Sequence, residues 1–202
     1  YSGFPYRGTL PRAITDARRD LERMLTQFLK RNRRNEDIAS ALYGAIVAQA
    51  RDPALYGDRG VPDTLEGRFE MIILHLALVL RHLRADEGEK AVGQALFDTF
   101  CTEMDRALRE MGVGDLGVGK RMRKMAEAFY GRAGRYDAGL ETGDAEAIAA
   151  TIGRALYDEA SDPRAGALAA YAAAVDHALS RTAPAALLAA DIAWPDPALA
   201  VR

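Results

Sequence analysis

The stretch PDTLEGRFEMIILHLALVLRHL, residues 62–83, decides the fold that we predict for this chain. Asp63 and Glu66 have the spacing of an acidic capping box, so we expect a helix to begin here. At 100° per residue this helix is apolar on two faces, one made by Phe69, Ile73, Leu76, Leu80 and Leu83 and the other by Met71, Leu74, His75, Leu78 and His82. A helix with two apolar faces is buried on both sides. The stretch therefore predicts a central buried helix at about 64–84.

The remaining sequence shows helical spacing and no alternation typical of strands. Two helices are predicted before the central one, at 12–31 and from an N-cap at Asn35 to residue 52, and four or five after it: 89–111, 116–140 and two or three alanine-rich helices. The chain is thus predicted to be all-α, a single-domain helical bundle of about seven helices. Residues 1–35 are expected to form a basic N-terminal helix. Residues 141–202 are expected to pack on the same domain as a peripheral addition.

The composition is that of a soluble globular protein, with 49% hydrophobic and 28% charged residues. A net charge of −2 argues against a nucleic-acid-binding protein. Residues 1–34, however, carry nine Lys or Arg against three Asp or Glu. This basic segment could contact phosphates or an anionic membrane surface, or it could be a solvated helix end. The longest near-apolar run, residues 71–80, is too short to span a bilayer. The single cysteine, Cys101, cannot form a disulfide within the chain and is therefore compatible with a reducing compartment.

The segment GDLGVGK, residues 114–120, has the glycine and lysine spacing of a phosphate-binding loop. Such a loop also needs a preceding strand and a Ser or Thr after the lysine. Here the preceding pattern is helical and Arg121 follows Lys120. We therefore expect no nucleotide site. The glycines are explained by helix ends: Gly112 closes one helix in a Schellman motif, and Gly114 lets Asp115 cap the next.

The predicted helix after this turn begins with four cations, Lys120, Arg121, Arg123 and Lys124. Positive charge at a helix N-terminus opposes the helix dipole. Three of the cations lie opposite the apolar stripe, on the side that carries Gly131 and Gly134. A docking surface for a partner and a merely solvated face both account for this pattern.

No residue pattern predicts catalysis, a metal site or a cofactor. His75 and His82 are seven residues apart, about 10.5 Å along a helix, which is too far to share one metal ion. His75 is expected to be a hydrogen-bonded core residue rather than a haem ligand with Met71. Asp98 and Asp105 are expected to pair with arginines.

The strings VPDTLEGRF, residues 61–69, and REMGVGDLGVGK, residues 109–120, lie in a segment that resembles the ubiquinol-cytochrome c chaperone family. The similarity covers roughly residues 36–140, which would form the chaperone-family helical core. The resemblance implies an α-helical, non-catalytic assembly factor. It would bind cytochrome b or another membrane-protein client during biogenesis of the bc1 complex, together with a small partner protein. A helical small-molecule, haem or anion-binding protein is the alternative.

The alanine-rich composition favours a bacterial member of that family. We therefore expect a cytoplasmic protein with peripheral contact at the inner membrane through the basic N-terminal helix. No nucleotide and no specific nucleic acid is expected as a partner. Contacts with a client are assigned to polar side chains around the loops at 53–63 and 112–119 and to the cationic helix start: Arg51, Tyr56, Arg68, Asp115, Lys120, Arg121, Arg123 and Lys124.

Overall fold

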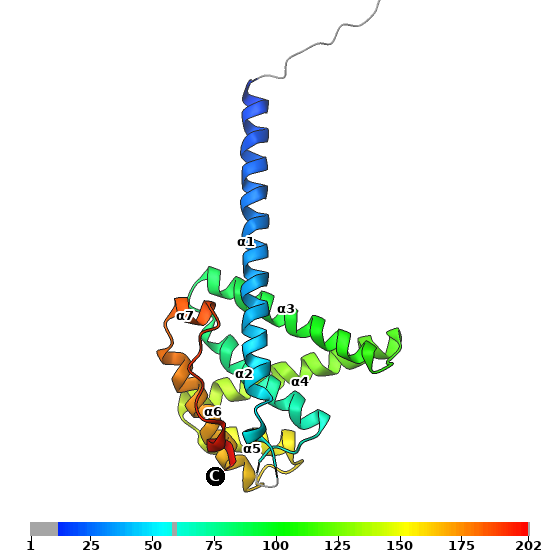
Figure 1. Ribbon diagram of the computed structural model, residues 1–202, viewed down its shortest axis with the longest axis vertical. Coiled ribbons are helices and arrows are strands. Elements are labelled where there is room, and N and C mark those ends of the chain that lie inside the picture. The colour runs from blue at the N-terminus through cyan, green and yellow to red at the C-terminus, as the bar shows by residue number, and fades with distance from the viewer. Residues whose placement is uncertain (1–11, 58–59, 202) are drawn as a thin grey trace, which may run out of the picture. The chain divides into compact units, whose positions relative to one another are not determined.

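The computed structural model describes residues 12–57 and 60–201 (Figure 1). Over these residues it is built from helices and connecting segments, without a strand, which confirms the all-α prediction. The elements are α1 (Arg12–Ala50), the short 3-10 helix η1 (Pro53–Leu55), α2 (Leu65–His82), α3 (Glu87–Glu110), α4 (Asp115–Thr142), α5 (Ala145–Leu156), α6 (Arg164–Arg181), α7 (Pro184–Leu188) and the 3-10 helix η2 (Pro197–Val201). No helix in the described part of the chain is long and apolar enough to cross a membrane.

The chain divides into two compact units, Tyr1–Asn35 and Glu36–Arg202. The predicted break between a first and a second helix at Asn35 is wrong, because α1 is one helix from Arg12 to Ala50. Residues 32–35 contain neither Gly nor Pro, and an asparagine inside a helix costs only a few tenths of a kcal/mol. In the second unit, α1 contributes Ala39, Leu42, Ile46 and Ala50, all fully buried.

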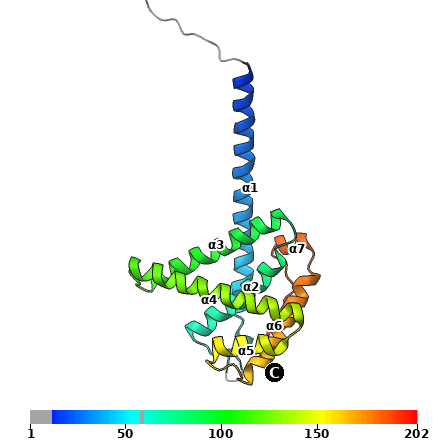
Figure 2. The ribbon, with the colours of Figure 1, turned by 180° about the vertical axis from the view of Figure 1, so that it is seen from behind.

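Helix α2 is the centre of the second unit, as predicted from its two apolar faces (Figures 1 and 2). Every residue from Glu70 to Val79 is buried, and α2 packs against α4, α5 and α6. The predicted cap is wrong by one residue. Thr64 caps α2 by accepting a hydrogen bond from the backbone N–H of Gly67 at 3.0 Å, while Asp63 pairs with Arg68. The first backbone N–H groups of a helix have no partner within the helix, and the hydroxyl of Thr64 accepts from one of them in place of the carboxylate of Asp63.

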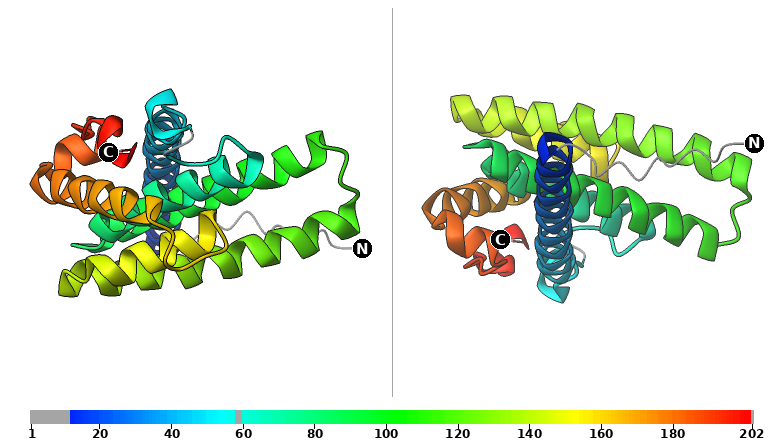
Figure 3. Two further views of the ribbon diagram at one scale, coloured as in Figure 1. Left: turned by 90° about the horizontal axis from the view of Figure 1, so that it is seen from below. Right: turned by 90° about the horizontal axis from the view of Figure 1, so that it is seen from above.

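Helices α3 and α4 run side by side and are joined by a short turn, which lies at one end of the pair in all views (Figure 3). Gly112 has φ +79°. The N–H of Val113 donates to the carbonyl of Leu108 at 3.1 Å, and that of Gly112 to Arg109 at 2.9 Å. These are the two hydrogen bonds of the predicted Schellman motif, which ends α3 and reverses the chain.

The alanine-rich helices are not a peripheral addition. Helix α6 packs against α2 and α5, and Tyr171 on α6 is fully buried. Leu168, Val175 and Leu179 continue the same buried stripe. Alanines add little volume but let helices approach closely, so a few large side chains are enough to complete this part of the core.

Candidate functional site

The first group of predicted contact residues gathers around the segment that joins α1 to α2. Arg68 donates to Asp63 at 2.7 Å and lies over the ring of Tyr56, with 5.9 Å between its guanidinium carbon and the ring centroid. The hydroxyl of Tyr56 donates to the carbonyl of Ala50 at 2.5 Å. Burial raises the pKa of Tyr56, while the positive charges of Arg68 and Arg51 oppose this effect. Arg51, Tyr56 and Arg68 therefore form one cluster, in which Arg51 and Arg68 are exposed.

This cluster is held in place by a close approach between backbone segments. A Cβ atom on Gly67 would lie 2.1 Å from the carbonyl oxygen of Pro62, so only glycine fits there. The hydroxyl of Tyr157 donates to the carbonyl of Gly60 at 3.0 Å, which ties the segment to the end of α5. The loop that carries Tyr56 is thus held by two contacts, one with the start of α2 and one with the end of α5.

The second group lies at the start of α4. Lys120, Arg121, Arg123 and Lys124 are all exposed, and none of them forms an ion pair with another described residue. Asp115 does not cap α4 as predicted. Gly114 is the N-cap residue, and the carboxylate of Asp115 pairs instead with Arg109, which also binds Asp105 at 2.6 Å. An aspartate in the first turn still favours the helix, because its charge complements the dipole.

The structure does not bring the two groups together. The turn between α3 and α4 lies away from the segment before α2 in every view (Figures 1 and 3). Beside the cations at the start of α4, the side chain of Leu116 is 97% exposed and that of Met111 is 51% exposed. The α4 group is therefore the more complete candidate contact surface, since it combines positive charge without a partner in the described chain and exposed apolar area. We call Leu116, Lys120, Arg121, Arg123 and Lys124 the α4 face.

The segment 114–120 is a helix start preceded by another helix, and the strand that a phosphate-binding loop requires is not found among the described residues. Within residues 12–57 and 60–201, no three His, Cys, Asp or Glu side chains are grouped to hold a metal ion.

His75 is a hydrogen-bonded core residue, as predicted. Its Nδ1 lies 2.7 Å from the carbonyl oxygen of Met71, so this nitrogen carries the proton. The Nε2 atom must then accept the hydrogen bond from the hydroxyl of Tyr171, at 2.9 Å, and that hydroxyl accepts in turn from Gln49 at 2.8 Å. Burial lowers the pKa of His75 to about 4. Because both ring nitrogens are used within the core, His75 has no free nitrogen to offer a haem iron.

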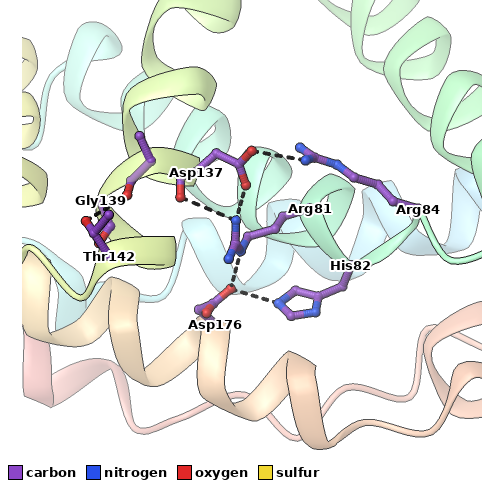
Figure 4. A network of polar contacts seen from close by, with 8 residues as sticks. Arg81, His82, Arg84, Asp137, Gly139, Thr142 and Asp176 are labelled. Carbon is purple, nitrogen blue, oxygen red and sulfur yellow. Dashed lines mark hydrogen bonds and ion pairs between the residues drawn. The ribbon is translucent and has the colours of Figure 1, made fainter.

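Sequence reasoning missed a polar network where α2 ends (Figure 4). Arg81 binds both Asp137 on α4 and Asp176 on α6, the latter at 3.2 Å, and His82 lies 2.8 Å from Asp176. Arg84 binds Asp137 at 3.1 Å. Burial would raise the pKa of Asp137, but the hydrogen bonds from Arg84 and Arg81 hold it below its usual value. The network joins three helices and has a structural role.

A second missed pair lies under α4, where Arg132 binds the buried carboxylate of Glu70 at 2.9 Å. Burial raises the pKa of Glu70 to about 7, against the effect of the positive charge of Arg132. The partners in both cases are more than 50 residues apart, so the only signal in the sequence was the presence of charges within largely apolar helical patterns.

Two comparisons with known proteins match this chain. A family model described as ubiquinol-cytochrome C chaperone matches residues 57–194, and so extends past the predicted limit of the similarity at residue 140. The chain is also similar to the Cbp3 homolog from Brucella abortus, known from its crystal structure. The two are 39% identical, with a TM-score of 0.75, and the match covers 86% of this chain and 97% of that one. No curated protein sequence matches.

Proposed function

Because the chain belongs to the ubiquinol-cytochrome c chaperone family, we propose that it binds cytochrome b or a related respiratory membrane subunit during biogenesis of the bc1 complex. The family is one of assembly chaperones, so the chain is a non-enzymatic assembly factor. The match over residues 57–194 carries this proposal. It includes α2, the turn between α3 and α4, and both groups of candidate contact residues except Arg51 and Tyr56.

The α4 face is the proposed contact surface for the client. Four cations lie on the second and third turns of α4 without an ion-pair partner among the described residues, so like charges repel one another there. An acidic or polar segment of a client would remove this unfavourable interaction on binding. The exposed side chain of Leu116 would add apolar contact at the edge of the charged surface. The Arg51, Tyr56 and Arg68 cluster is proposed as a second contact.

The distribution of exposed apolar residues favours binding of extramembrane loops over burial of a whole membrane-spanning segment. On the described residues of the second unit the large exposed apolar side chains are Leu65, Met111, Leu116 and Tyr130, which are spread over α2, α4 and the turn before α4. A surface that covered a membrane helix would need a continuous apolar area of a few hundred Å². Reversible binding of loops, with release when partner subunits arrive, needs only the charged face and a few apolar contacts.

Contact with an anionic membrane is proposed for the first unit. In α1 the side chains of Met24, Phe28 and Leu29 are 50–67% exposed, and Arg31 lies 6.0 Å from the ring of Phe28. Exposed apolar side chains next to basic ones are typical of helices that lie on a membrane surface. This supports a cytoplasmic protein, peripheral at the inner membrane, that meets its client as the client is inserted.

Deleting the protein tests the function. Spectroscopic cytochrome b and assembled bc1 complex in membranes should both fall, and a plasmid-borne copy should restore them. Normal levels of both in the deletion strain would contradict the proposed client.

A charge reversal tests the surface. Lys120→Glu with Arg123→Glu should abolish co-purification of the client while leaving the helical circular dichroism spectrum unchanged. Lys90→Glu with Arg181→Glu is the matched control, because both side chains are exposed and lie on α3 and α6. If both double variants retain the client equally, the α4 face is only a solvated surface.

A further inference from the structure

A groove of about 430 Å³ lies between α4 and α5. On α4 it is lined at positions 124, 128, 131, 132 and 135, whose spacing of three and four places them on one side of the helix, and on α5 at positions 151, 154 and 155. Its polar lining consists of four cations, one carboxylate and one hydroxyl: Lys124, Arg132, Arg135, Arg154, Glu127 and Thr151. The groove is thus strongly positive.

Most of this positive charge is not neutralised within the described chain. Lys124, Arg135 and Arg154 form no ion pair with any described residue. The hydroxyl of Thr151 already donates to the carbonyl of Ala147 at 2.9 Å. Like charges that converge on one groove repel one another, and a bound anion would relieve this repulsion.

Arg132 extends the positive charge to the floor of the groove. One of its nitrogens, Nη2, binds Glu70, while the other, Nη1, is buried without a hydrogen-bond partner. The second carboxylate oxygen of Glu70 is also unpartnered. Because Nη1 is shielded from solvent and Nη2 is bound to Glu70, Arg132 contributes positive charge beneath the groove and not a free pair of donors.

Gly131 keeps the groove open. A Cβ atom at this position would approach only Nη1 of Arg135, at 3.9 Å, so a longer side chain has space to project there. Gly131 lies inside α4 and does not have a positive φ, so the backbone does not require glycine. The missing side chain leaves room for a ligand beside Arg135.

We propose that the groove between α4 and α5 binds a phosphate group. Lys124, Arg135 and Arg154 would bind its oxygens, and Arg132 would add positive charge beneath them. A volume of about 430 Å³ lies in the range of small-molecule sites and exceeds what inorganic phosphate fills. The groove thus has room for an organic phosphate, either a soluble ester or the headgroup of an anionic lipid. This inference does not rest on the identity of the client, although Lys124 belongs both to the α4 face and to the groove.

Two probes distinguish the two sources. The full chain is titrated with inorganic phosphate at constant ionic strength, with amide chemical shifts as the readout. It is also floated with vesicles of phosphatidylcholine, with and without phosphatidylglycerol. Saturable shifts at α4 and α5 residues with phosphate, without flotation that depends on the groove, indicate a soluble ligand. Flotation that needs phosphatidylglycerol and is weakened by the groove variants below indicates a lipid headgroup, whereas flotation that those variants leave unchanged comes from the basic first unit.

Arg135→Gln with Arg154→Gln should weaken whichever binding is observed by about tenfold or more, because two charge-assisted hydrogen bonds are lost. Gly131→Leu should weaken it without changing the charge. Lys120→Gln with Arg121→Gln removes the same charge from α4 outside the groove and should have less than about a twofold effect.

The proposal is overturned if neither probe binds, or if the control variant loses as much binding as the groove variant. Circular dichroism checks that each variant is folded. None of these measurements involves the bc1 complex. A negative result for phosphate binding therefore does not contradict the proposed chaperone function, and a negative result of the deletion experiment does not contradict phosphate binding in the groove.

Discussion

Acidification should destabilise the native state through His75. This side chain is fully buried, and its neutral form satisfies both hydrogen bonds, with Nδ1 donating to the carbonyl of Met71 and Nε2 accepting from Tyr171. Protonation would place a second N–H against the hydroxyl hydrogen of Tyr171 and a positive charge in an apolar core. Burial accordingly lowers the pKa of His75 from 6.5 to about 4.

The magnitude follows from the two pKa values. Between pH 6.5 and about 4 the unfolded state holds the proton and the native state does not, so the free energy of unfolding falls as the pH falls. The loss is about 2 kcal/mol from pH 7 to pH 5 and approaches about 3 kcal/mol at lower pH. Glu70 acts in the opposite sense. Burial raises its pKa from 4.5 to about 7, so the native state retains that proton more strongly and the free energy of unfolding rises as the pH falls through this range.

Comparison with a variant isolates the histidine. Urea unfolding of the wild type and of His75→Gln at pH 7 and pH 5 cancels the effect of Glu70, which both proteins share. The variant should be less stable at pH 7, but it should lose about 2 kcal/mol less than the wild type on going to pH 5. His177→Gln, at an exposed position on α6, should behave as the wild type. If His75→Gln loses as much stability as the wild type, His75 is not held neutral by burial.

Two further predictions concern stability. Tyr171→Phe should cost about 1–3 kcal/mol in urea unfolding, because Nε2 of His75 is left buried without a donor, and an unchanged midpoint would refute the hydrogen bond. Gly67→Ala should lower the melting temperature, because its Cβ would lie 2.1 Å from the carbonyl oxygen of Pro62. Gly134 lies in helical backbone with open space around its Cα, so Gly134→Ala should instead raise the free energy of unfolding by up to about 1 kcal/mol. Equal effects of the two substitutions would refute the close approach at Gly67.

The successful predictions rested on local signals. The double apolar face of α2, the glycine that ends α3 and the buried role of His75 each follow from neighbouring residues in the chain. The errors also had local causes. The caps of α2 and α4 were displaced by one residue, because Asp63, Thr64, Gly114 and Asp115 are adjacent cap formers and the sequence does not rank them. Sequence reasoning also divided α1 at Asn35, where no helix-breaking residue stands.

The sequence by itself determined the helical class, the central position of α2, the exposed cations at the start of α4 and the family. These features depend on periodicity, on backbone conformation at single residues and on strings of residues. Only the tertiary structure decided that α6 supplies the hydroxyl for His75, that Arg81 joins α4 to α6, and that cations from α4 and α5 line one groove. The reason is physical: such contacts depend on how helices pack in space, and packing brings together residues whose separation along the chain carries no signal.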